Sequence, residues 1–145
     1  MHYNVAIIVS VDDEKETEED IKSTVDRMLS ERYDQLGFMM DYYSVKSAEK
    51  VKKEDARGKL KEFYDDEFSE FKENLSKIRE HINESDYQLF NDEDFRHAAY
   101  RINPYVGWHL TVFDDTMTHI GPSKLDDHLK YVSPEIWLVT VDFHY

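Results

Sequence analysis

The sequence contains no cysteine, three prolines and four glycines among its 145 residues. Without cysteine, the chain can form neither a disulfide framework nor a thiolate metal site, and this absence is typical of a reducing compartment. So few glycines and prolines argue against a series of tight turns or a flexible linker. A hydrophobic content of 40%, of which aromatic residues are a large part, indicates a globular chain rather than a disordered one.

Long hydrophobic runs are also missing. The apolar run Val5–Val11 is far shorter than the roughly 20 residues that a membrane-spanning helix needs. The N-terminus shows no basic segment and no small-residue cleavage site of the kind that marks a secretory signal. We therefore expect a cytoplasmic protein with no membrane partner, and the length fits a single α+β domain over residues 1–145.

Positive charge is scarce, because 18 Lys and Arg face 32 Asp and Glu, for a formal net charge of -14. Such a charge opposes direct binding to nucleic-acid phosphates or anionic membranes and favours a basic protein as partner. An alternative explanation is that the charge only keeps a small protein soluble.

Two segments are apolar on both faces and are predicted to be central strands, residues 4–11 and 136–143. Two further strands are predicted over residues 36–45 and 106–113. The residues Asp114-Asp115 are predicted to form a hairpin turn after the second of these.

Helices are predicted from their capping residues and their apolar spacing. Thr17-Glu-Glu-Asp20 is a capping-box variant that opens a helix ending near Tyr33. A long helix is predicted from Ser47 to about Asn83. Asn91–Asp94 caps a short helix through Tyr100, and Ser123–Asp126 resembles a second capping box.

This order of strands and helices predicts an α+β fold, with helices packed on a mostly antiparallel sheet. The preferred version is a ferredoxin-like core with a long helical insertion at about 47–100.

The long helix separates its charges from its apolar residues. At about 100° per residue, six carboxylates fall within roughly 80° of one another. We call them the acidic flank: Glu62, Asp66, Glu70, Glu73, Glu80 and Glu84. The opposite side carries an apolar stripe, which is expected to be buried: Leu60, Tyr64, Phe68, Phe71, Leu75, Ile78 and Ile82. The flank is either a solvated helix face or a surface that competes for a basic groove normally holding DNA or RNA.

The segment His109-Leu-Thr111 resembles the His-x-Thr element of the two-histidine phosphoesterases. Residues at i and i+2 of a strand project to the same face, and imidazole can move protons near neutral pH. That family carries two such elements, whereas His2-Tyr-Asn4 and His119-Ile-Gly121 lack the hydroxyl. The alternative is a structural histidine beside a packed strand.

A zinc site is a further alternative, because Asp142 and His144 stand at i and i+2 and His109 could lie on a neighbouring strand. The simpler interpretation is a pair of exposed polar residues at a strand end. We expect no metal and no cofactor.

Several elements together resemble those of a family of small uncharacterised bacteriophage proteins. They are Val5–Val11, Leu29-Ser-Glu-Arg-Tyr-Asp34, Asn103-Pro-Tyr-Val-Gly-Trp108 and Val141-Asp-Phe-His144. The resemblance implies an origin in a phage or prophage and residence in the host cytoplasm.

Three hypotheses follow. The first is a phage-type accessory protein that binds and inhibits a basic host protein, such as a nucleic-acid-binding defence factor, through the acidic flank. The second is a small phosphodiesterase that uses His109 and Thr111. The third is a structural homodimer joined through an exposed sheet edge.

Overall fold

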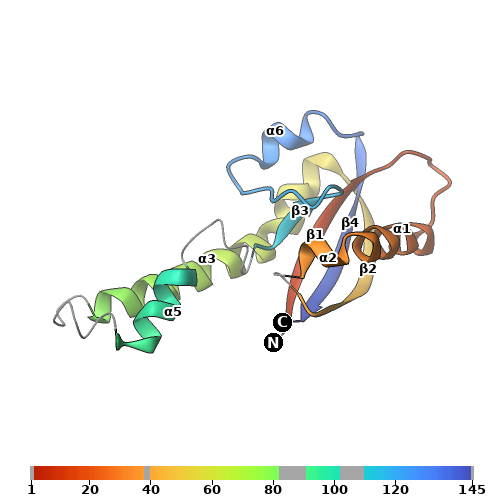
Figure 1. Ribbon diagram of the computed structural model, residues 1–145. Helices are drawn as coiled ribbons and strands as arrows, with labels where there is room; N and C mark the ends of the chain where they lie inside the picture. Colours follow the sequence, from red (N-terminus) through yellow and green to blue (C-terminus); the bar gives the residue numbers. More distant parts are fainter. Residues whose placement is uncertain (1, 38–39, 82–90, 102–109, 145) are drawn as a thin grey trace. The chain divides into compact units, whose positions relative to one another are not determined.

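A computed structural model describes residues 2–37, 40–81, 91–101 and 110–144 (Figure 1). The chain divides into two compact units, one of Met1–Tyr64 with Leu110–Tyr145 and one of Asp65–His109. Helix α3 (Ala56–His81) begins in the first unit and ends in the second. This division does not test the predicted single domain over residues 1–145, which stays a prediction.

The first unit is built on a four-stranded sheet in the order β2-β4-β1-β3. The two strands predicted from apolar runs, β1 (His2–Ser10) and β4 (Glu135–His144), are its central pair. They run antiparallel, with Val5 opposite Val141. The edge strand β2 (Tyr42–Lys52) pairs antiparallel with β4, and the short β3 (Val112–Asp114) pairs parallel with β1.

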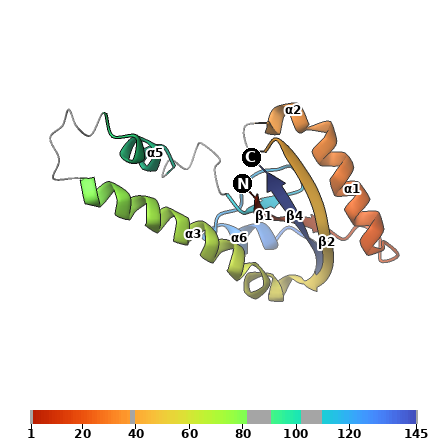
Figure 2. The same ribbon diagram turned by 90° about the horizontal axis from the view of Figure 1, so that it is seen from below.

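One face of the sheet is covered by α1 (Glu18–Glu31), with the short α2 (Tyr33–Leu36) after it (Figure 2). Ile21, Val25 and Leu29 project from α1 at helical spacing and are buried against this face. The sheet contributes the alternate residues of β1 and β4, among them Val5, Ile7, Val139 and Val141.

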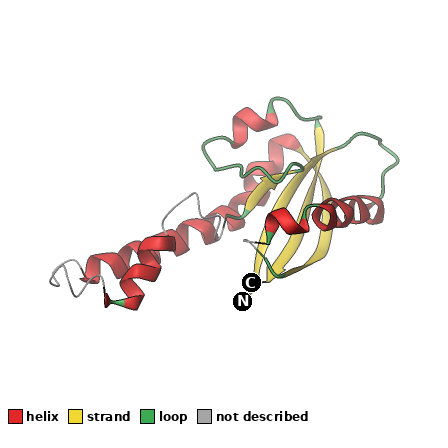
Figure 3. Ribbon diagram, in the orientation of Figure 1, coloured by secondary structure: helices red, strands yellow, loops and turns green. Residues whose placement is uncertain are grey.

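The other face is covered by the first turns of α3 and by α6 (Leu125–Leu129) (Figure 3). Ala56 and Leu60 of α3 pack there with Leu125 of α6 and with Ala6 and Ile8 of β1. Because both faces of β1 are covered, its sequence is apolar without alternation.

The predicted α+β class with a mostly antiparallel sheet is therefore confirmed. A ferredoxin-like core contains split β-α-β units, in which a third strand lies between two parallel strands. Strands β1 and β2 form such a unit, with β4 between them. Strand β3 departs from that arrangement, because it lies at the edge opposite β2 and runs parallel to β1.

The prediction of a helix from Ser47 is wrong, because Ser47 lies within β2. The predicted strand over 36–45 likewise begins too early, since Leu36 ends α2 and β2 starts at Tyr42. As an edge strand, β2 carries lysines, which discourage pairing with other chains. These lysines obscure the alternation of apolar and polar residues that would mark the segment as a strand. The helical insertion thus begins at the 3-10 turn Lys53–Asp55.

Local signals were predicted with mixed success. The capping box of α1 is confirmed: Asp20 N–H donates to Thr17 Oγ1 at 3.3 Å, and Thr17 N–H donates to Asp20 Oδ2 at 2.9 Å. The box predicted at Ser123 is wrong, because Lys124 is the N-cap of α6 and makes no side-chain capping bond. The turn at Asp114 is confirmed, since its carboxylate accepts the backbone N–H groups of Thr116 and Thr118.

The described part of the second unit consists of α3 from Asp65 onward and α5 (Glu93–Arg101). Asp92 caps α5, as predicted, by accepting the Phe95 N–H at 2.8 Å. His81 at the end of α3 lies 3.4 Å from the Asp92 carboxylate and packs edge-on against Phe95. None of the described helices is long and apolar enough to cross a membrane.

Candidate functional site

The acidic flank lies on α3, and most of its described members face water. Glu62, Asp66, Glu73 and Glu80 are exposed, and Glu70 is half-buried. Glu84 lies outside the described residues. The unbroken helix from Ala56 to His81 holds Asp66, Glu73 and Glu80 seven residues apart on one side.

The lysines of α3 neutralise only part of this flank. Lys77 Nζ pairs with Glu73 Oε1 at 3.0 Å, four residues along the helix. Lys59 is held away from the flank by Glu49 of β2, at 2.7 Å. Over the described part of the chain, no ion pair forms at Glu62, Asp66 or Glu80, so their charges remain available to a partner.

The apolar stripe is not buried along its length, which corrects the sequence prediction. Leu60 is fully buried, and Tyr64 packs partly into the core with its hydroxyl donated to the Ile120 carbonyl at 2.8 Å. Beyond them, Phe68 is 60%, Phe71 43% and Leu75 37% exposed. We call these three residues the exposed seam.

A polar residue of α3 is buried instead. Asn74 is 4% exposed, and its Nδ2 donates to the Glu70 carbonyl at 3.0 Å. The covered side of α3 in the second unit therefore borders the exposed seam but does not include it. The sequence locates the helix correctly but does not show which side is covered, because that depends on the neighbouring segments.

The structure places Thr111 but not His109, which lies outside the described residues. Thr111 is 4% exposed, and its Oγ1 donates to the Phe63 carbonyl at 2.9 Å. Strand β3 begins only at Val112, so Thr111 precedes it and does not sit within a strand. A hydroxyl committed to an α3 carbonyl is poorly placed to bind phosphate, and the geometry gives the phosphodiesterase alternative no support.

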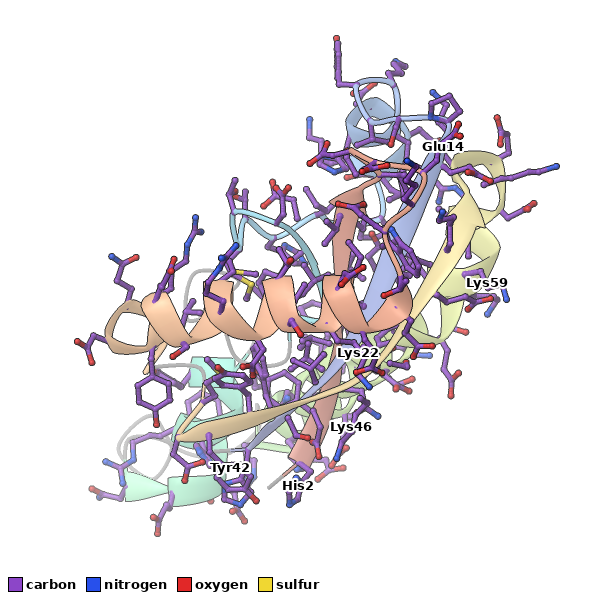
Figure 4. All side chains as sticks on the ribbon, turned by 90° about the vertical axis from the view of Figure 1, so that its right-hand side faces the viewer. His2, Glu14, Lys22, Tyr42, Lys46 and Lys59 are labelled. Carbon is purple, nitrogen blue, oxygen red and sulfur yellow. The ribbon has the colours of Figure 1, made fainter. Side chains whose placement is uncertain are left out.

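A second polar cluster, which we call the terminal cluster, lies at the paired ends of three strands. His144 of β4 stands opposite His2 of β1 on one side and opposite Tyr42 of β2 on the other. The imidazoles of His2 and His144 are 4.8 Å apart between ring centres, and the Tyr42 ring stacks on His144 at 4.3 Å. Figure 4 shows His2 and Tyr42 side by side at this end of the sheet.

Two carboxylates orient the imidazoles of the terminal cluster. Asp142 lies 3.2 Å from His2 Nδ1 and 3.4 Å from Lys46 Nζ. Asp41 lies 2.6 Å from His144 Nδ1, and this hydrogen bond lowers the pKa of the Asp41 carboxyl below its ordinary value. A paired imidazole can hold and pass a proton, so acid–base chemistry is within the reach of these residues.

The sequence sets Asp142 and His144 together as a pair, but it does not group them with His2, Asp41 and Tyr42. These three residues join the cluster through the register of the sheet strands, and no local sequence motif indicates which residues the register brings together. The proposed use of Asp142 and His144 as zinc ligands finds no support, since no group of three His, Cys, Asp or Glu among the described residues could hold a metal ion.

A pocket of about 310 Å³ opens in the first unit, lined by Lys53, Glu54, Arg57, Asp126, Leu129 and Lys130. Two of its cations already have partners, with Arg57 at 2.9 Å from Asp126 and Lys130 at 2.6 Å from Asp127. The hydrogen bond between Lys130 and Asp127 raises the pKa of the lysine and lowers the pKa of the carboxyl. These pairs satisfy most of the positive charge that would draw an anionic ligand.

A family model described as a domain of unknown function (DUF7995) matches residues 44–145, which is most of the chain. The chain belongs to this family. The DUF7995 match begins inside β2 and includes α3 with the acidic flank, the exposed seam and the strand β4. Strand β1 and helix α1, which complete the sheet and cover one of its faces, precede the match. Comparisons with curated proteins and with solved structures found no match.

Proposed function

We propose that this chain is a non-enzymatic binding protein of phage type, which occupies the basic surface of a host protein through its acidic flank. The observation that carries the proposal is the exposure of Asp66, Glu73 and Glu80 along one side of α3, with a single lysine pair at Glu73. Carboxylates that neither pack nor pair contribute little to folding, and like charges at this spacing oppose it slightly.

The charge of one segment of α3 supports a basic partner. Residues 62–73 hold six carboxylates and one lysine. From Asp66 to Glu80 the helix rises by about 21 Å, a length suited to an extended groove rather than a point contact. The remaining charge of the chain, which is also negative, would steer such a partner toward it from a distance.

A groove that binds nucleic acid is the partner surface with the most suitable chemistry. Its lysines and arginines are spaced to meet a row of negative phosphates, and a row of carboxylates offers the same sign of charge to the same side chains. Occupation of that groove would exclude the nucleic acid, so binding alone would inhibit a nuclease or other defence factor in the host cytoplasm.

Affinity capture from bacterial host lysate, followed by mass spectrometry, tests this proposal. The bait proteins are the native chain, a flank variant with Asp66→Lys, Glu73→Lys and Glu80→Lys, and a matched control with Asp12→Lys, Glu14→Lys and Glu31→Lys. The control residues are exposed acids of the first unit, one of which, Glu14, is labelled in Figure 4. Both variants change the net charge by the same amount.

We expect a basic protein that the native chain and the control retain at low salt, and that both release at high salt. The flank variant should fail to retain it. Equal capture by the flank variant would refute the role of the flank, and equal loss from both variants would show that only net charge matters.

A further inference from the structure

The exposed seam of α3 follows a regular repeat. From Tyr64 the apolar residues recur at intervals of four, three, four and three, through Phe68, Phe71 and Leu75 to Ile78. This is the spacing with which one helix packs along another. The rings of Phe68 and Phe71 also stack on each other at 6.5 Å, so the seam is already arranged as a continuous apolar surface.

Exposure of three large apolar side chains beside a buried Asn74 indicates that the seam is covered by something other than the described part of its own chain. We propose that the exposed seam is the contact between two copies of this chain, whose α3 helices pair antiparallel. In this pairing, Phe71 of each copy faces Leu75 of the other, and Phe68 faces Ile78.

Charge complementarity selects a second copy as the occupant. The row Asp65, Lys72 and Arg79 borders the seam at intervals of seven residues. When the seam meets itself in antiparallel orientation, Asp65 of each copy lies opposite Arg79 of the other, at both ends of the contact. Lys72 meets its own counterpart at the centre, where its Nζ lies 5.6 Å from the centre of the Phe68 ring.

Only the antiparallel orientation sets Asp65 of one copy opposite Arg79 of the other. A parallel pair would set the row Asp65, Lys72 and Arg79 against Glu67 and Asn74 of the second copy. The acidic flank lies on the far side from the seam and stays exposed in the antiparallel pair.

The contact is small, so we expect a reversible dimer rather than an obligate one. Sedimentation of the full chain over a range of concentrations should show twice the mass of the chain. Phe68→Glu should weaken the dimer by at least about tenfold, because it places a charge in the middle of an apolar contact. The matched control is Tyr131→Glu, at an apolar residue of the first unit that is 90% exposed, and it should leave the dimer unchanged.

The orientation is tested by charge exchange. Asp65→Arg or Arg79→Asp alone should weaken the dimer, and the double variant should restore it. The two residues lie about 21 Å apart along one helix, so restoration can only arise between copies. Circular dichroism of each variant separates loss of association from loss of folding.

Because the chain has no cysteine, a single introduced thiol provides an independent readout. Lys72→Cys should cross-link two copies through a short bifunctional thiol reagent, whereas Ser76→Cys, exposed on the far side of the row, should not. A monomer at every concentration up to about 0.1 mM would overturn the proposal. A dimer indifferent to Phe68→Glu, or one weakened by the double variant as much as by the single ones, would overturn it as well.

Discussion

Asn74 and Phe68 stand six residues apart on the same helix, and the polar residue is buried while the apolar one is exposed. The amide is 4% exposed and the phenyl ring 60%. The reversal leaves the exposed seam uncovered, and we assign this seam to self-association and the acidic flank to a basic partner. The first turns of the helix pack in the core of the first unit, and its later turns carry the exposed seam and most of the acidic flank.

The two leucines of α3 give a direct test of that division. Leu60→Ala should lower the free energy of unfolding by about 2–5 kcal/mol, because Leu60 is fully buried between α3 and the sheet. Leu75→Ala, the same substitution 15 residues later, should cost less than about 1 kcal/mol in the dilute monomer. Urea unfolding at low protein concentration measures both, and equal losses would contradict the exposed seam.

Thr111 tests whether the His109 segment is structural. Thr111→Val keeps the side-chain shape but removes the donor to the Phe63 carbonyl, and we expect a loss of about 1–3 kcal/mol of unfolding free energy. If stability were unchanged while hydrolysis of cyclic or linear oligonucleotides were lost, the phosphodiesterase alternative would be the better account.

The terminal cluster makes stability depend on pH through Asp41. Its folded pKa lies below its unfolded value because of the hydrogen bond to His144. The stabilisation is therefore present above the unfolded pKa and is lost as the pH falls through the folded pKa. Melting temperatures of the native chain and of Asp41→Asn should differ near pH 6 and converge near about pH 2.

A constant difference in melting temperature between these two proteins across that range would contradict the assignment of the shift to Asp41. Asp34→Asn is a suitable control, because Asp34 is an exposed acid of the same unit.

Elements whose signal is local were predictable from the sequence. The central strands β1 and β4 follow from runs of apolar residues that only a sheet covered on both faces can bury. The Thr17–Asp20 box and the Asp92 cap follow from hydrogen bonds within one turn of a helix.

Elements decided by distant neighbours were not predictable. Strand β2 reads as polar because it has a partner on one side only, and Ser47 consequently resembled a helix cap. The terminal cluster brings His2 to Asp142 across 140 positions of the sequence. Which side of α3 is buried beyond Tyr64 depends on packing in the second unit, so the stripe pattern alone predicts burial of residues that are exposed.

The acidic flank is the binding surface on which the proposed function depends. Its most direct test is calorimetric titration of the captured basic protein with the native chain, the flank variant and the matched control, each over a series of salt concentrations. We predict that the flank variant binds at least about tenfold more weakly than the control and shows a shallower dependence on salt. Equal affinities and equal salt dependence for the flank variant and the native chain would contradict it.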